Sequence, residues 1–399
     1  MPPGPAGIVA RMWRPAWLDR TDLWLVGLTL AIKVGLIAMG AVAIAMGHGS
    51  FDDGILSTWD RWDAPHYTDI AVFGYMARDP GTLVGPNGYE QVFPGDLDLY
   101  IVFYPLYPWL VGAVTALIGA PVAAAFLVTG IASLIVAPLL RRLVAADLGD
   151  VIGARSAYFL LVFPTAYFLH IGYTEALFLA LALGSFWLAR TDRWWLAGGA
   201  AALATLTRVN GLLLLPALAV EAWLQWSADP ARRLRVEWVA IGGVVIGLAG
   251  YLALNAAVYG DAFAFARIQS EHWHKELAPP WEGIGSALGW LESDEPDRVL
   301  MHGWMELLFL GLGLAAIVAS AELGFRPTWT VWMAGNWLLI AGTGFLLSTP
   351  RYDLVLFALF PWFAVMADRR PLVGVAISAV SLAGLGWFAW RFASGQWAF

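Results

Sequence analysis

Apolar runs long enough to cross a lipid bilayer follow one another from Thr21 almost to the C-terminus, and no other feature constrains the fold as strongly. A helix spans the apolar core of a bilayer with about 20 residues. The 399-residue chain is 60% hydrophobic and 13% charged, whereas soluble domains average about 25% charged residues. The runs are continuously apolar, unlike the alternating strands of a membrane barrel. We therefore predict an all-α, polytopic membrane protein with a single domain over residues 1–399.

The hydropathy pattern predicts about eleven transmembrane helices. The first is too long for the core of a cleaved signal peptide, so we interpret it as a retained signal anchor. A further apolar run at 101–119 is assigned to a juxtamembrane helix, because counting it as a span would place the basic residues that follow on the outer side. The predicted spans are 22–46, 121–140, 154–170, 174–189, 194–207, 211–226, 237–258, 303–320, 328–347, 352–367 and 372–390.

The basic residues give this arrangement an orientation. Fourteen of them, including Arg11 and Arg14, then lie on one side and eight on the other, and basic residues accumulate on the cytoplasmic side. The N-terminus is therefore predicted to be cytoplasmic and the C-terminus extracytoplasmic. The short loops and the Ala/Arg/Trp-rich composition favour a bacterial plasma membrane.

Two predicted extracytoplasmic segments, 47–120 and 259–302, are much longer than the connections usual between packed helices. Long loops in compact proteins commonly carry function. The first segment is strongly acidic, with nine carboxylates against Arg61 and Arg78. We therefore expect the functional site on the extracytoplasmic side, with juxtamembrane helices in the first segment.

Composition and missing motifs exclude several classes of function. The net charge of −7 argues against nucleic acid as a partner. The sequence contains no cysteine, which removes disulfides, thiol nucleophiles and thiolate metal sites. It also carries no Walker loop, dinucleotide fingerprint or HExxH helix. The chemistry is therefore limited to oxygen and nitrogen groups.

The stretch 59–71 in the first outer segment mixes carboxylates, aromatic rings and a histidine. A helix beginning near Pro65 would have Asp63 at its N-terminal end. In the simpler interpretation Asp63 is only a helix cap and the tryptophans are interfacial anchors. The alternative is a site at the membrane surface. Its candidate residues are Asp60, Asp63, His66, Tyr67 and Asp69.

Small polar clusters lie at the predicted outer ends of three spans. Ionisable groups in or next to apolar spans are costly and suggest function, although helix caps and snorkelling arginines explain any one of them. Their shared side favours an outward cavity for an anionic, lipid-linked substrate. The clusters are Tyr173-Thr174-Glu175, Thr207-Arg208-Val209-Asn210 and Ser348-Thr349-Pro350-Arg351-Tyr352-Asp353.

Three other polar residues are weaker candidates for a functional role. His272 and His274 flank Trp273, and two imidazoles at this spacing can share a metal ion. A substrate or supporting contact by His272 and a merely solvated loop are both favoured over metal ligation. Lys33 lies inside the first span, and an internal partner or a snorkelled side chain is its simplest explanation.

Several motifs resemble those of the GPI mannosyltransferase II family. Trp62-Asp63-Ala64-Pro65-His66-Tyr67, followed by Ile70-Ala71 and Gly74-Tyr75, is similar to its WDA-x-H-[FY]…IA-x-x-GY signature. Further similar elements follow in family order, so the resemblance covers about residues 55–365. These elements are Phe103-Tyr104-Pro105-Leu106-Tyr107-Pro108, Phe163-Pro164, Tyr173-Thr174-Glu175, Arg208 with Asn210-Gly211, and Pro350-Arg351-Tyr352.

The resemblance implies the fold of the C-type membrane glycosyltransferases, and an enzyme that takes mannose from a polyprenyl-phosphate carrier on the extracytoplasmic face. It implies that Asp63 is the general base of an inverting transfer to a hydroxyl of a lipid-linked or glycan acceptor. Asp60 and Asp69 remain open as alternative bases. The substrate-binding residues expected from the motifs and clusters are Asp60, His66, Tyr67, Tyr104, Tyr173, Glu175, Arg208, Asn210, His272, Arg351 and Tyr352.

No metal or other cofactor is expected, because Arg208 or Arg351 can neutralise the departing phosphate. Three alternative functions remain open at this point. The first is a related transferase that uses another polyprenyl-phosphate sugar, and the second is a transporter or lipid flippase. The third is a structural or assembly subunit. Transporters tend to carry inverted repeats and polar groups at the membrane midplane, whereas these clusters lie at outer helix ends.

Overall fold

The computed structural model describes residues 19–399, so Arg11 and Arg14 lie outside the described residues. This part of the chain is helical, with two isolated bridges and no strand. Six of its helices are long and apolar enough to span a membrane, as expected for an integral membrane protein. They are Arg20–Ala45 (α2), Pro121–Leu148 (α5), Val209–Ala228 (ending in α9), Val236–Tyr259 (ending in α10), Pro296–Glu322 (ending in α14) and Pro371–Ala393 (α18).

Shorter helices complete the bundle. Most predicted spans coincide with one helix, but 154–170 is interrupted after Val162, 328–347 is helical only to Ala341, and 352–367 is broken after Val355. The shorter helices fall below 18 residues, so the number eleven stays a prediction, with a bent pair at the C-terminal side giving up to seven long spans. They are α6 (Asp150–Val162), α7 (Glu175–Arg190), α8 (Trp194–Thr205), α15 (Pro327–Ala341), α16 (Thr349–Tyr352) and α17 (Leu359–Arg369).

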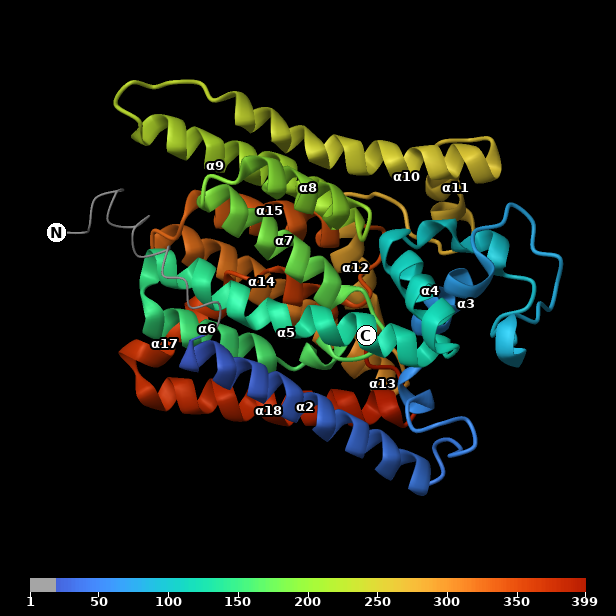
Figure 1. Cartoon of the computed structure of the whole chain (residues 1–399). Coiled ribbons are helices and arrows are strands. Elements are labelled where there is room, and N and C mark those ends of the chain that lie inside the picture. Colours follow the sequence, from blue (N-terminus) through green and yellow to red (C-terminus); the bar gives the residue numbers. More distant parts are fainter. Residues whose placement is uncertain (1–18) are drawn as a thin grey trace.

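The two long connecting segments fold into short helices at one end of the bundle (Figure 1). The predicted juxtamembrane helix is present as α4, which is only 13 residues long and stops at Gly119 in the left-handed conformation that glycine adopts readily. Figure 1 shows α3, α4 and α11 grouped opposite the connection between α9 and α10. The helices are α3 (Ala64–Phe73), α4 (Leu106–Ile118), α11 (Ala264–Glu271), α12 (Pro280–Trp290) and α13 (Pro296–Arg298).

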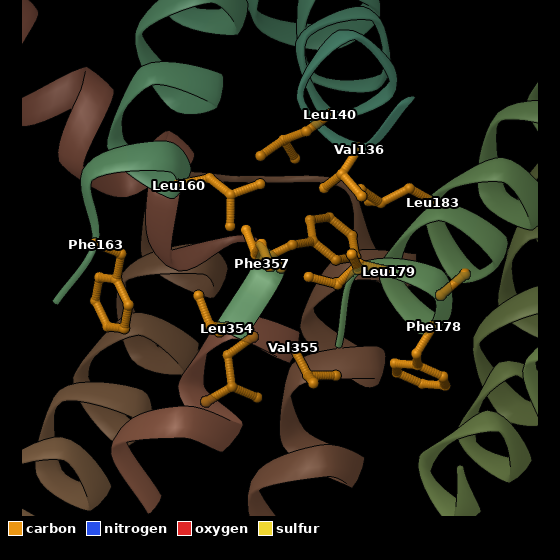
Figure 2. Close-up of a cluster of buried hydrophobic side chains, with 14 of the residues drawn as sticks. Val136, Leu140, Leu160, Phe163, Phe178, Leu179, Leu183, Leu354, Val355 and Phe357 are labelled. Carbon is orange, nitrogen blue, oxygen red and sulfur yellow. The ribbon is translucent and has the colours of Figure 1, made fainter. Parts of the chain in front are cut away.

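The core of the bundle surrounds a point after α16 where the helix is interrupted and the chain bends. The two parts of this bent segment, Thr349–Val355 and Leu359–Arg369, meet at 81°, and Figure 2 shows Leu354, Val355 and Phe357 of the break among apolar side chains of α5, α6 and α7. Irregular backbone at membrane depth requires internal hydrogen-bond partners. The indole of Trp332 supplies one, because it donates to the Val355 carbonyl at 2.9 Å. Beside this break, α16 holds Arg351 at the end of the bundle where the first long connecting segment carries Asp63.

Candidate active site

Asp63 occupies the N-cap position of α3, with Pro65 in the first turn of the helix. Its side chain caps no backbone amide among the described residues. The Asp63 carboxylate instead accepts a hydrogen bond from Arg351, with Oδ2 and Nη1 2.9 Å apart. The Asp63 side chain is 30% exposed. A capping role alone therefore does not account for Asp63, whose carboxylate is held by a distant arginine and remains accessible.

Arg351 joins Asp63 to a second carboxylate. Its guanidinium Nε lies 2.9 Å from Oε1 of Glu175, at the start of α7. The Arg351 side chain is only 7% exposed, and its guanidinium faces the rings of Phe168, Tyr173 and Tyr352 at 5.1–5.3 Å. A buried guanidinium needs paired charges and hydrogen-bond acceptors. Asp63 and Glu175 supply both.

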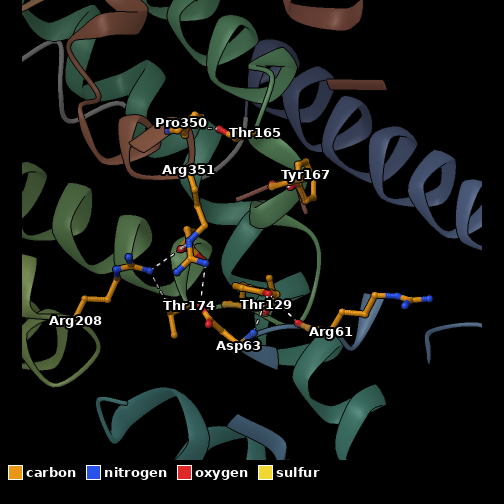
Figure 3. A network of polar contacts seen from close by, with 12 residues as sticks. Arg61, Asp63, Thr129, Thr165, Tyr167, Thr174, Arg208, Pro350 and Arg351 are labelled. Carbon is orange, nitrogen blue, oxygen red and sulfur yellow. Dashed lines mark hydrogen bonds and ion pairs between the residues drawn. The ribbon is translucent and has the colours of Figure 1, made fainter. Parts of the chain in front are cut away.

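Arg208 completes the network from the segment before α9. Its Nη1 donates to Glu175 Oε1 at 2.6 Å and to Thr174 Oγ1 at 2.7 Å. Figure 3 shows Arg208 and Arg351 extending from different segments toward the same place beside Asp63. Glu175 thus bridges two arginines. Each of the three predicted clusters contributes to this network, the first through both Thr174 and Glu175.

The turn before Asp63 is held by Tyr173. The Tyr173 hydroxyl donates to the Arg61 carbonyl at 2.9 Å and accepts from the Asp63 amide at 3.2 Å. Burial raises the pKa of the Asp63 carboxyl, but the charges of Arg351 and His66 and the hydrogen bond from Arg351 outweigh burial and hold this pKa below its ordinary value. Asp63 is therefore ionised near neutral pH.

Lys275 is a site residue that sequence reasoning missed. Its ammonium lies 5.3 Å from the centroid of the Tyr352 ring, and Arg208 faces the same ring at 5.5 Å. Within residues 19–399 Lys275 forms no ion pair, although its charge acts on the buried Glu306 carboxylate next to Ser348 and Thr349. The composition gave one indication of Lys275, because Lys33 and Lys275 are the only lysines in an arginine-rich chain.

The two alternative base candidates have different surroundings. Burial and the charge of Asp69 raise the pKa of the Asp60 carboxyl to about 7. Asp69 itself is fully buried, and its oxygens accept hydrogen bonds from the Tyr89 hydroxyl at 2.8 Å and the Val92 amide at 3.1 Å. Asp69 therefore organises the first outer segment, whereas the Asp60 carboxylate has no hydrogen-bond partner in the described chain.

His66 and Tyr67 follow Asp63 on α3 and lie in aromatic surroundings. The His66 imidazole is stacked on Phe93 at 5.0 Å and Phe103 at 4.8 Å, and burial lowers its pKa despite the charge of Asp63. No hydrogen bond joins the His66 and Asp63 side chains among residues 19–399. Tyr67 is buried, with its ring 6.4 Å from that of Tyr173.

Three predicted binding residues lie outside the network. Tyr104 stacks on Tyr251 with ring centroids 4.1 Å apart, and the Asn210 amide donates to Asn336 Oδ1 at 2.7 Å. His272 is exposed on the second outer segment. Substrate contact stays a prediction for these residues, as it does for all the predicted binding residues. Lys33 has an internal partner, since its ammonium donates to the His170 carbonyl at 2.8 Å.

A shallow, open apolar groove lies along α15. Its volume is about 540 Å³, and it is formed by α15 and the segments that follow Arg208 and Lys275 in sequence. Such a lining suits a hydrocarbon chain. The lining residues are Leu213, Leu277, Ala278, Pro279, Gly335, Leu338, Leu339 and Gly342.

Comparison with protein families gives a match over part of the chain. Residues 104–254 match the family described as dolichyl-phosphate-mannose-protein mannosyltransferase. The match includes Tyr173, Glu175 and Arg208 but ends before Arg351 and begins after Asp63. No curated protein matches the chain.

Two solved structures match most of this chain at low sequence identity. The chain is 13% identical to ArnT from Cupriavidus metallidurans bound to undecaprenyl phosphate, with 92% of this chain and 76% of that chain covered and a TM-score of 0.49. It is 12% identical to the apo oligosaccharyltransferase of Archaeoglobus fulgidus, with 91% and 56% covered and a TM-score of 0.44. The chain thus spans little more than half of the oligosaccharyltransferase.

Proposed function

We propose that this protein is an inverting glycosyltransferase of the C-type membrane class, which moves a sugar, with mannose as the first candidate, from a polyprenyl-phosphate carrier to an acceptor hydroxyl on the extracytoplasmic face. The observation that carries the proposal is the Asp63 carboxylate held by Arg351 within a cluster of cations. The family match over residues 104–254 supports this class of reaction and this class of donor.

Asp63 would act as the general base. The acceptor oxygen attacks the anomeric carbon, the bond from that carbon to the phosphate oxygen breaks, and the acceptor proton passes to Asp63. The hydroxyl becomes strongly acidic only as the new carbon–oxygen bond forms. A carboxylate with a lowered pKa therefore suffices, and attack opposite the leaving phosphate inverts the anomeric configuration.

The cations would receive the departing lipid phosphate. Arg208 and Arg351 are already paired with Glu175, so Lys275, which forms no ion pair in the described residues, would supply a further positive charge. A phosphate near Lys275 and Tyr352 would let the carrier chain enter the apolar groove, whose Leu277 lies two residues after Lys275. Preorganised cations of this kind stabilise the charge that develops on a leaving group.

The test is a transfer assay with the purified full-length protein. Polyprenyl-phosphate carriers bearing radiolabelled mannose, glucose or arabinose are incubated with a membrane lipid extract and, in parallel, with mannotetraose, each with and without EDTA. We expect labelled product from the mannose donor and the same rate in EDTA, because arginine and lysine supply the cationic charge. Transfer from another donor alone would refute mannose, and loss in EDTA restored by a metal would refute metal independence. No transfer from any donor would refute the proposed reaction.

A further inference from the structure

Four aromatic side chains form a row that starts beside Asp63, and we call it the aromatic row. Trp62 contacts Trp397 edge-on, with ring centroids 5.1 Å apart. Trp397 is stacked on His302 at 5.9 Å, and His302 lies 5.5 Å from Trp290. The row therefore links the first outer segment, the residues after α18, the start of the α14 span and the end of α12.

The backbone holds Trp62 in a strained conformation. Its φ is 57°, a left-handed value that is unfavourable for a bulky residue and is retained where the surroundings impose it. The Tyr173 hydroxyl bonds to the carbonyl before Trp62 and to the amide after it, so both flanking peptide groups are fixed. The Trp62 indole is 39% exposed. The strain thus presents an open ring next to Asp63 instead of packing it inside.

Charged groups flank the row at Trp397 and at Trp290. Arg391 is paired with Asp297 at 2.9 Å, and the Asp297 side chain is 62% exposed. The Arg298 guanidinium lies over the Trp290 ring at 5.7 Å. Exposed ionic groups are costly in hydrocarbon, and belt tryptophans serve as interfacial anchors to the lipid. Rings that contact one another among exposed charges indicate a surface that faces water.

The row also carries an unused hydrogen-bond donor. The Trp397 indole nitrogen is buried and has no partner within the described residues, and such groups in native structures call for an explanation. The imidazole of His302 adds a second polar group. Flat aromatic faces with polar tips match a sugar ring, which has apolar C–H faces and a rim of hydroxyl groups.

We infer that the aromatic row is a glycan-binding subsite for an oligosaccharide of two or more hexoses. This inference rests on the proposed function. The acceptor is then a glycan whose terminal sugar lies at Trp62 with a hydroxyl at Asp63, and whose following sugars contact Trp397, His302 and Trp290. The acceptor class is thus defined by chain length as well as by its terminal hydroxyl.

Calorimetric binding of methyl α-mannoside and α-mannotetraose to the full-length protein tests this subsite without a donor. Wild type should bind the tetramer more tightly than the monomer. Trp290→Leu and, independently, His302→Leu should each weaken tetramer binding about fivefold to tenfold, the value of one aromatic contact. Trp304→Leu is the matched control, because Trp304 is a neighbouring, 55% exposed tryptophan outside the row. This variant should bind the tetramer like wild type.

With the labelled donor, Trp290→Leu should raise KM for mannotetraose and change kcat less than twofold. Equal affinity of wild type for monomer and tetramer, or equal effects of Trp290→Leu and Trp304→Leu, would overturn the subsite. Absence of transfer with length-dependent binding intact would refute the proposed reaction and leave the subsite standing, so the two failures are distinguishable.

Discussion

Arg351 Nη1 and Asp63 Oδ2 lie 2.9 Å apart, although the two residues are separated by 288 positions in the sequence. Asp63 belongs to the first outer segment and Arg351 to the broken helix near the C-terminal end. The pair therefore joins an outer loop to the core of the bundle. It also orients a partly exposed carboxylate and keeps it charged.

Removal of Arg351 should shift the pH dependence of the reaction upward. The charge of Arg351 lowers the pKa of Asp63 against the effect of burial, so Arg351→Gln leaves burial to raise this pKa. The acid limb of kcat/KM should then move to higher pH. Arg208→Gln should cause a smaller shift, because Arg208 contributes less to this pKa. An unchanged or lowered acid limb in Arg351→Gln would contradict this role of the pair.

Glu175 should be required for stability as well as for activity. Its carboxylate is 1% exposed and bridges Arg208 and Arg351. Glu175→Gln leaves two poorly compensated guanidiniums, and breaking a buried ion pair costs about 3–5 kcal/mol. Thermal unfolding in detergent should show a clear loss of Tm.

The matched control for Glu175 is Asp368→Asn at the other end of the bundle. Asp368 pairs with Arg155 at 2.6 Å, but both side chains are more than 40% exposed. Exposed pairs contribute about 0–1 kcal/mol, so the control should change Tm little. Equal Tm values for both variants would show that Glu175 is not a structural bridge.

Many residues of this site could be predicted from the sequence, but their contacts with one another could not. The motif around Asp63 and the late Pro350-Arg351-Tyr352 element named both members of the ion pair but not their contact, since Arg351 was expected to neutralise the departing phosphate. The apolar runs located most of the helices. Lys275 was missed because only the folded second outer segment brings it over Tyr352. Tyr104 was expected at the site on motif grounds, yet it stacks on Tyr251 from α10, a partner that sequence spacing does not specify.

Asp60 should make stability depend on pH. Its folded pKa of about 7 lies above the ordinary value of 3.8, so the folded protein retains a proton that the unfolded chain releases between about pH 4 and 7, and stability falls as pH rises through that range. Asp60→Asn should raise Tm at pH 8 and leave it nearly unchanged at pH 4. Asp52→Asn, an exposed carboxylate of the same segment, should show neither effect. A Tm difference for Asp60→Asn that is the same at both pH values would refute this assignment.

Lys275 should control donor affinity. A hydrogen bond to a charged group contributes about 1.5–3 kcal/mol, so Lys275→Gln should raise the donor KM roughly tenfold to a hundredfold. Arg267→Gln is the control, because Arg267 is an exposed cation of the same segment already paired with Glu271. Initial rates over a donor concentration series give the donor KM of Lys275→Gln and of Arg267→Gln. A donor KM unchanged in Lys275→Gln would remove the lysine from the phosphate site.

The most direct test of the account is the turnover of Asp63→Asn, measured with saturating polyprenyl-phosphate sugar and acceptor beside wild type and Asp52→Asn. Asparagine keeps the shape of Asp63 and removes its basicity, while Arg351 retains Glu175 as a partner. We expect a loss in kcat of about 10²- to 10⁴-fold, the range for general base catalysis, with Tm near that of wild type. Near-normal turnover by Asp63→Asn would contradict the assignment of Asp63 as the base.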